Sequence, residues 1–112
     1  MAAGEPAPVA VTSANFATTV LEGPRPALVD FGVDWCGPCV AVTPVIRSLA
    51  AEYADRLIVA TVDVDKEPDL AARYGVRSLP TVMLVDGGEI RRVLVGARSG
   101  QEYRAAIDGL LH

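Results

Sequence analysis

The chain has 112 residues, which fits one domain and leaves no room for a second. Its 51% hydrophobic and 21% charged residues exclude a disordered chain, and a domain of this size folds without disulfide staples or a structural metal. A net charge of −4 disfavours nucleic acid as a partner, because phosphate binding requires a basic patch. No apolar stretch approaches the roughly 18 residues of a membrane span, so we expect no membrane partner.

The first eight residues differ in composition from the rest. Residues 1–8 are rich in Ala, Gly and Pro, which predicts a flexible tail ahead of a folded domain over residues 9–112. The tail contains Glu5 but no Lys or Arg, so it lacks the basic start of a secretory signal. We therefore expect a cytoplasmic protein, in a compartment that keeps thiols reduced. We also expect the protein to be a monomer.

The first predicted elements are a strand, a helix and a second strand. Residues 9–12 form the first strand, and Ser13 caps a helix over residues 14–21. The apolar run at residues 27–31 is typical of a buried strand, although Asp30 interrupts it.

A longer helix starts at the cysteine pair. Pro44 interrupts its pattern, which predicts either a kink or a new helix with Thr43 as its cap. The apolar residues of this segment recur at steps of three and four, the spacing of one helix face: Cys39, Val42, Ile46, Leu49 and Tyr53.

The second half of the chain continues the alternation of strands and helices. Residues 57–64 and 81–85 are rich in β-branched residues, which predicts strands, and a short helix over residues 68–74 lies between them. The turn at residues 86–88 then returns the chain as a hairpin arm over residues 90–95.

The last predicted helix starts at a capping box formed by Ser99 and Glu102. Because strands and helices alternate, the sequence predicts an α/β fold: a central mixed sheet with helices on both faces. The first half of the sheet should be parallel, and the C-terminal hairpin antiparallel.

The segment Cys36-Gly37-Pro38-Cys39 follows a strand and opens a helix. Its spacing brings both sulfurs to one side of the first helical turn, close enough for a disulfide. Cys36 lies at the helix start, where free amides and the helix dipole lower the thiol pKa below about 8.5. Cys39 lies further in, on the apolar face, where desolvation keeps it protonated.

This unequal acidity predicts dithiol–disulfide exchange. Cys36 attacks a target disulfide, and Cys39 then resolves the mixed disulfide and releases the reduced target. Gly37 lets a substrate backbone approach closely, and Pro38 fits a first helical turn. The sole histidine, His112, is the last residue and cannot serve a Cys–His hydrolase, and two cysteines are too few for a tetrahedral zinc site. We therefore expect no metal and no bound cofactor.

The segment Trp35-Cys36-Gly37-Pro38-Cys39 resembles the active-site motif of the thioredoxin family. Val29-Asp30-Phe31 stands upstream at the family's distance, residues 74–81 resemble the segment that ends in a cis-proline, and Val95-Gly96-Ala97 resembles the later Gly-Ala turn. The resemblance covers nearly the whole chain and implies the thioredoxin fold and a protein-disulfide reductase. It also implies recycling by NADPH through thioredoxin reductase.

The resemblance also implies roles for individual residues. Asp30 matches a buried aspartate that accepts the Cys39 proton, and burial raises the pKa of such a carboxyl toward the range of a general base. A cis bond before Pro80 would place its ring against the sulfurs and leave the backbone of Leu79 free to pair with substrate. The expected substrate groove consists of Trp35, Gly37, Pro38, Leu79, Pro80, Gly96 and Ala97.

The residues alone leave alternatives for these positions. Asp30 could lie at a frayed strand end, Pro80 could follow an ordinary trans bond, and Trp35 could be a core residue.

Three positions depart from the family pattern. Gly32 stands where many relatives have an aromatic residue, Val40 where Lys is common, and Thr61 where a Lys often partners the buried aspartate. Without these two positive charges the Cys36 thiolate should be less stable, and the pKa of Asp30 should be higher. We therefore expect an open site with altered pH dependence and partner range.

Two other functions remain compatible with these residues. One is an oxidase or isomerase of the same fold, because the direction of exchange depends on redox poise. The other is a binding or regulatory subunit whose groove holds a partner without turnover. The Gly-Pro dipeptide between the cysteines and the missing export signal favour reduction.

Overall fold

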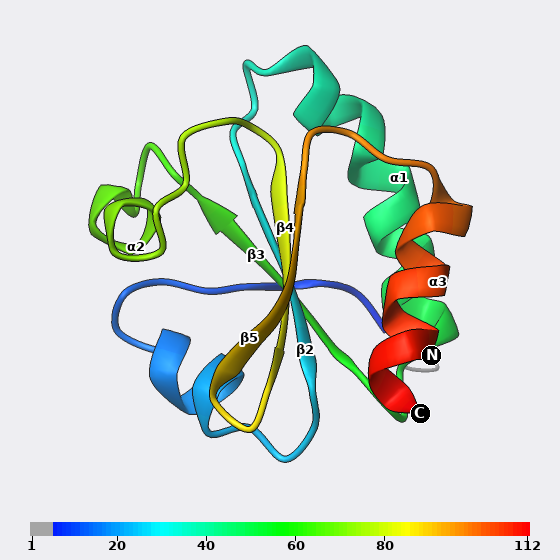
Figure 1. Cartoon of the computed structure of the whole chain (residues 1–112). Coiled ribbons are helices and arrows are strands. Elements are labelled where there is room, and N and C mark those ends of the chain that lie inside the picture. The colour runs from blue at the N-terminus through cyan, green and yellow to red at the C-terminus, as the bar shows by residue number, and fades with distance from the viewer. Residues whose placement is uncertain (1–5) are drawn as a thin grey trace, which may run out of the picture.

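The computed structural model describes residues 6–112, so most of the tail predicted over residues 1–8 lies outside the described residues. Five strands form one central sheet in the order β1-β3-β2-β4-β5 (Figure 1). In chain order the strands are β1 (Val9–Ala10), β2 (Ala27–Gly32), β3 (Ile58–Asp63), β4 (Thr81–Asp86) and β5 (Glu89–Val95).

The sheet is mixed, as predicted. β1 and β2 both pair in parallel with β3, whereas β4 is antiparallel to β2 and β5 is antiparallel to β4. The β4–β5 hairpin turns through Gly87 and Gly88, whose φ angles of 62° and 79° are easily reached only by glycine.

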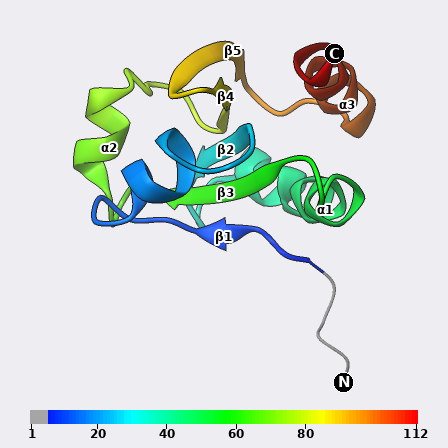
Figure 2. The same ribbon diagram turned by 90° about the horizontal axis from the view of Figure 1, so that it is seen from below.

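Helices cover both faces of the sheet (Figures 1 and 2). α1 (Gly37–Glu52) and α3 (Gly100–Leu111) lie on one face, and η1 (Ala17–Leu21) and α2 (Pro68–Arg73) lie on the other. Side chains of a strand alternate between the faces, so Leu28 of β2 packs under α1 and α3 while Phe31 packs toward α2. Asp30 therefore faces α1.

The N-terminal elements differ from the sequence prediction. β1 is only two residues long, and the helix expected over residues 14–21 is a short π-type helix at Ala17–Leu21. Ser13 does not cap it, because its backbone amide and hydroxyl donate to Oε1 of Glu67 at 2.9 and 3.2 Å. This contact joins the loop after β1 to the start of α2, which no local pattern could predict.

The two long helices begin as the sequence predicts. α1 is a single helix with Pro44 inside it, so a new helix at Pro44 is wrong. The Thr43 hydroxyl donates to the Cys39 carbonyl oxygen at 3.2 Å instead of capping a helix. At the start of α3 the Glu102 amide donates to Oγ of Ser99, and the Ser99 amide donates to Oε1 of Glu102, which confirms the capping box.

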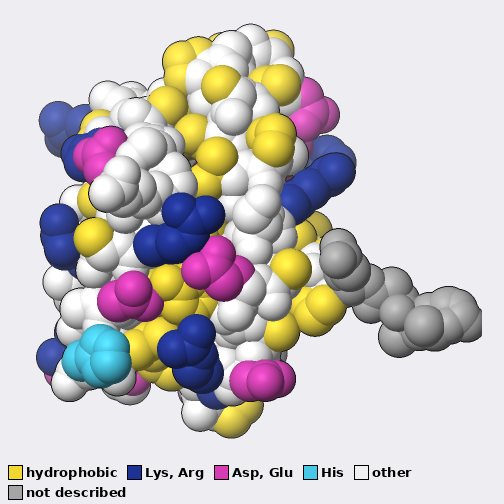
Figure 3. All heavy atoms as spheres, turned by 90° about the vertical axis from the view of Figure 1, so that its right-hand side faces the viewer, with side chains coloured by type: hydrophobic (Ala, Val, Ile, Leu, Met, Phe, Trp, Pro, Cys, Tyr) yellow, Lys and Arg dark blue, Asp and Glu magenta, His cyan; other side chains and the backbone are white. Residues whose placement is uncertain are grey.

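Two polar contacts join α3 to α1, on the face shown in Figure 3, where charged and apolar side chains alternate. The Tyr53 hydroxyl donates to Asp108 at 2.8 Å, and Arg104 pairs with Glu52 at 2.9 Å. α1 thus packs on the sheet and is joined to α3 near its C-terminal end.

Candidate active site

Cys36 is the N-cap residue of α1. Its backbone is extended, with φ −97° and ψ 115°, and it forms a disulfide with Cys39 across a Cα–Cα distance of 5.2 Å. The backbone amide of Cys39 donates to Sγ of Cys36 at 3.3 Å. A free amide of the helix start therefore points at the Cys36 sulfur, where it can stabilise negative charge.

The two cysteines differ in their exposure. Cys39 is buried between α1 and the sheet and is only 6% exposed. Cys36 is half-buried, and its neighbours Gly37 and Pro38 are exposed. An incoming disulfide can therefore reach Cys36 but not Cys39.

The loop before β4 lies against the disulfide. The bond between Leu79 and Pro80 is cis, and the Leu79 carbonyl oxygen lies 3.9 Å from Sγ of Cys36. The Gly96 amide donates to the Pro80 carbonyl oxygen at 2.8 Å, which ties the turn at Gly96 and Ala97 to the same loop. Residues far apart in sequence thus meet beside Cys36.

Trp35 lies on the surface, which excludes the core alternative. Its side chain is 73% exposed, and its Nε1 donates to Oδ2 of Asp65 at 2.6 Å. Asp65 follows β3, and its own amide donates to Oδ1 of Asp63 at 2.9 Å. Sequence reasoning missed Asp65. The position of Asp65 just after β3 could have indicated it. β2 and β3 are parallel and end side by side at Gly32 and Asp63, so residues that follow these two strands lie at the same edge of the sheet.

Asp30 lies inside β2, so the frayed-end alternative is wrong. It stands beside Thr61 of β3 and Val82 of β4 in the sheet register. Its Oδ1 is fully buried and has no hydrogen-bond partner in the described part of the chain. Burial raises the pKa of Asp30 from 3.8 to about 6. A carboxyl with this pKa can take up and release a proton near neutral pH.

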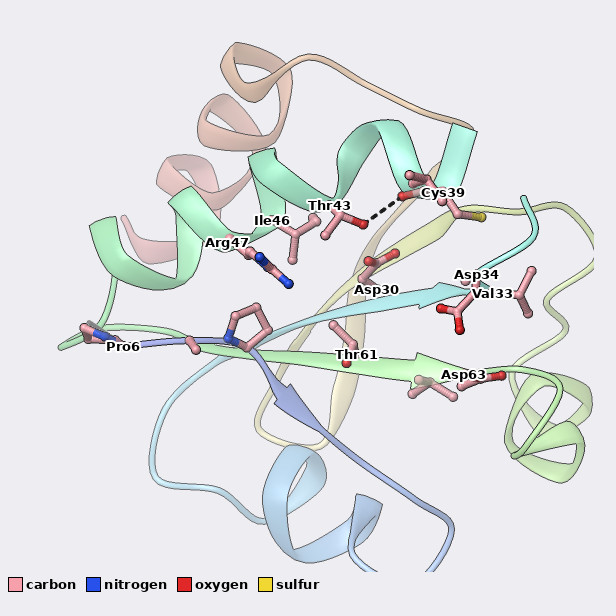
Figure 4. A pocket seen from close by; sticks show the side chains of 15 residues that line it. Pro6, Asp30, Val33, Asp34, Cys39, Thr43, Ile46, Arg47, Thr61 and Asp63 are labelled. Atoms are coloured by element: carbon pink, nitrogen blue, oxygen red, sulfur yellow. Dashed lines mark hydrogen bonds between the residues drawn. The ribbon is translucent and has the colours of Figure 1, made fainter. Parts of the chain in front are cut away.

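A cavity of about 540 Å³ lies between α1 and strands β2 and β3, with Asp30 on its wall (Figure 4). The three departures from the family pattern, Gly32, Val40 and Thr61, all line it. A Cβ atom at Gly32 would lie 3.3 Å from Cβ and 3.4 Å from Sγ of Cys39. Cys39 therefore packs closely against the backbone of Gly32, where even one added methyl group would crowd it.

Within residues 6–112, no group of three or more His, Cys, Asp or Glu side chains is arranged to hold a metal ion. None of the helices in this range is both long enough and apolar enough to cross a membrane.

Comparison with known sequences assigns the family. A sequence profile described as Thioredoxin matches residues 7–109. "Thioredoxin" of Acidithiobacillus ferridurans is 40% identical over 101 residues, which cover 90% of this chain and 94% of the relative. "Thioredoxin" of Allochromatium vinosum is 43% identical over 100 residues, covering 89% and 94%, and "Thioredoxin 1" of Synechococcus elongatus is 46% identical over 88 residues, covering 79% and 82%.

These matches confirm the predicted family and fold, and they favour a reductase over a subunit that binds without turnover. The geometry of the site agrees with this assignment, because the disulfide lies at the first turn of α1 with Cys36 accessible and Cys39 buried. The chain belongs to the thioredoxin family and is a thiol–disulfide oxidoreductase that reduces disulfides through a dithiol pair.

Proposed function

We propose that this chain reduces disulfides of other proteins with Cys36 as nucleophile and Cys39 as resolving cysteine. The hydrogen bond of 3.3 Å from the Cys39 amide to Sγ of Cys36 carries this assignment. It places a helix N-terminal donor on the accessible sulfur, so the thiolate form of Cys36 is stabilised. Cys39 has no such exposure and stays protonated until a base removes its proton.

The reaction then runs in two exchanges. The Cys36 thiolate attacks one sulfur of the target disulfide, and the other target sulfur leaves as a thiolate. Asp30 takes the proton of Cys39, whose thiolate attacks Sγ of Cys36 and displaces the second target thiolate. Two electrons pass to the target, and the cysteine pair ends as the disulfide.

The target segment is proposed to lie across the exposed side of the disulfide. Trp35 forms one wall, Gly37 and Pro38 leave room for the target backbone, and Leu79 pairs with it in the manner of a strand. The short distances from the Leu79 carbonyl to Cys36 and from Gly96 to Pro80 support this groove, which Pro80, Gly96 and Ala97 complete.

The oxidised chain must be reduced before the next turnover. We propose that it works as a monomer in the cytoplasm, where NADPH supplies electrons through a thioredoxin reductase and this chain binds no cofactor itself. Membership of the family supports this route.

The roles of the two cysteines are tested by single substitutions. Reduction of a model protein disulfide is measured with a dithiol or a thioredoxin reductase as electron source, for wild type, Cys36→Ser and Cys39→Ser. Cys36→Ser is expected to lose all turnover. Cys39→Ser is expected to accumulate a mixed disulfide, detected by mass spectrometry, because it can attack but cannot resolve. Turnover by Cys36→Ser would reject the assignment.

A further inference from the structure

The strand β5 is a long and exposed edge of the sheet. It pairs with β4 on one side, and Figure 2 shows no described strand beyond it on the other. Every residue of β5 except Leu94 is exposed. The opposite edge, β1, is only two residues long. Because the unpaired backbone of an edge strand can pair with another chain, β5 is a candidate interaction surface.

Two residues of β5 direct their backbone groups to this free edge. The Gly96 amide donates to the Pro80 carbonyl oxygen at 2.8 Å, so the backbone of Gly96 faces β4. Hydrogen-bonded pairs alternate along an antiparallel ladder, and the register is continuous from Gly96 back to Val93. The N–H and C=O groups of Val93 and Val95 therefore point away from β4. The bond of 3.3 Å from Nε of Arg98 to the Val95 carbonyl oxygen agrees with this direction.

Three apolar side chains of β5 form a strip on one face. Residues directly opposite each other in an antiparallel pair share a face. Val93 lies opposite Met83, which belongs to the core under η1 and α2. Ile90 lies opposite Val85 of the same core, and Val95 shares the face of Val93 because it is two residues further on. The side chains of Ile90, Val93 and Val95 are 44–50% exposed.

Arg92 adds a positive charge on the other face of β5. It lies opposite Leu84, which belongs to the core under α1 and α3. Arg91 pairs with Glu89 at 3.3 Å, whereas Arg92 has no ion pair in the described part of the chain. An extended segment in which apolar and acidic side chains alternate would place apolar groups on the strip and a carboxylate beside Arg92.

The apolar strip adjoins the proposed substrate groove. Val95 directly precedes Gly96 and Ala97, which belong to the groove. Val93 is three residues before Gly96, which is about 10 Å along a strand. A target segment in the groove therefore needs only a few more residues to lie along β5. A second copy of this chain is a poorer partner, because it would bring its own Arg92 to the same seam.

We propose that the free edge of β5 extends the target-binding surface and pairs with an extended target segment in which apolar and acidic residues alternate. This inference rests on the proposed function, because the segment is the one beside the disulfide that Cys36 attacks. Its backbone bonds to the N–H and C=O of Val93 and to the N–H of Val95. Its apolar side chains cover the strip, and a carboxylate pairs with Arg92. β5 thus selects among target proteins.

Three peptide substrates test this selection. Each carries one cysteine in a disulfide with an aromatic thiol whose thiolate absorbs visible light, so attack by Cys36 on the peptide sulfur releases a coloured product. The short peptide is Gly-Cys-Gly. In the two long peptides, about six residues, the usual strand length, flank the cysteine on each side. They alternate Val with Glu in the acidic peptide and Val with Lys in the basic one.

Arg92→Glu is expected to reverse the preference between the long peptides. The ratio of kcat/KM for the acidic peptide to that for the basic peptide should fall about tenfold, because an attraction becomes a repulsion. Arg73→Glu is the matched control, since it changes the net charge equally at an exposed position in α2. At physiological ionic strength it should leave the ratio unchanged. An unchanged ratio in Arg92→Glu, or an equal fall in both variants, overturns the proposal.

Val93→Pro tests the backbone pairing. Proline removes an N–H that points outward and leaves the ladder to β4 in place. The value of kcat/KM for the acidic peptide relative to Gly-Cys-Gly should fall about fivefold, as for one lost hydrogen bond. Val93→Thr keeps the N–H and the branched shape and should lose less. A wild-type dimer in analytical ultracentrifugation that Val93→Pro abolishes would assign the edge to a second copy and overturn the proposal.

Hydrogen exchange measured by NMR tests the pairing without a change in β5. Cys39→Ser is trapped as the mixed disulfide with the acidic peptide or with Gly-Cys-Gly. The Val93 amide should exchange at least tenfold more slowly in the first complex, because it is then hydrogen-bonded. Equal exchange in both complexes overturns the pairing, even if Val93→Pro does not fold.

The short peptide distinguishes failure of this inference from failure of the proposed function. If Cys36→Ser releases the aromatic thiolate from Gly-Cys-Gly as fast as wild type, Cys36 is not the nucleophile and both proposals fail. If wild type reacts through Cys36 but prefers neither long peptide and shows no protection at Val93, only the role of β5 is rejected.

Discussion

Trp35 and Asp65 connect two loops at the carboxyl end of the sheet, through a hydrogen bond of 2.6 Å from the indole Nε1 to Oδ2. Trp35 is 73% exposed, so little of the ring is packed, and this bond fixes the position of its Nε1 atom. Because Trp35 precedes Cys36 directly, the orientation of the indole shapes one wall of the proposed groove.

Asp65→Ala is expected to release the indole and weaken target binding. KM should rise about fivefold with little change in kcat, the equivalent of one hydrogen bond of about 1 kcal/mol. Asp65→Asn keeps an acceptor and should restore most of the loss. Trp35 is the sole tryptophan, so its fluorescence anisotropy reports the mobility directly. Unchanged anisotropy in Asp65→Ala would contradict this role.

Asp30→Asn is expected to stabilise the fold at alkaline pH. Folding raises the pKa of Asp30 from 3.8 to about 6, so the ionised carboxylate is disfavoured in the native state. The stability associated with the protonated form is present below pH 3.8 and is lost as pH rises through about 6. Two pKa units correspond to about 3 kcal/mol, which sets the upper limit of the gain at pH 8.

Urea unfolding of the oxidised chain at pH 4 and pH 8 measures this difference. Asp55→Asn serves as the control, because Asp55 is exposed. The burial account fails if Asp30→Asn differs from wild type by the same free energy at both pH values.

Gly32→Ala is expected to crowd Cys39. The added Cβ would lie 3.3 and 3.4 Å from the cysteine atoms, closer than ordinary contact, and overpacking of this kind costs about 1–3 kcal/mol. Replacing Gly by Ala also lowers the conformational entropy of the unfolded chain, which stabilises the fold by about 0.4–1 kcal/mol. We therefore expect the free energy of unfolding to fall by about 1 kcal/mol in total. Gly109→Ala on α3 meets no atom within 4 Å and should stabilise instead, as thermal unfolding of both variants would show.

Ser99→Ala is expected to destabilise α3. It removes the hydroxyl that accepts from the Glu102 amide at 3.1 Å, and loss of an N-cap costs about 1 kcal/mol, or roughly 5 °C in Tm. Ser48→Ala, at an exposed position within α1, should not lower Tm. A similar Tm change in both variants would show that the capping box has no special contribution.

The sequence by itself determined the features that depend on neighbouring residues. The Cys36-Cys39 spacing, the Ser99–Glu102 box and the hairpin at Gly87 and Gly88 follow local backbone rules, and the structure contains each of them. The strand composition likewise predicted a mixed sheet, because alternating strands and helices allow few arrangements.

Only the tertiary structure decided which distant residues meet. The bonds from Ser13 to Glu67 and from Trp35 to Asp65 join segments 54 and 30 positions apart, and no local pattern specifies such pairs. The cavity likewise depends on tertiary structure, because the register sets Thr61 beside Asp30 and α1 supplies the opposite wall. Sheet order and register result from packing of the whole chain, so the environment of Asp30 became visible only in the folded protein.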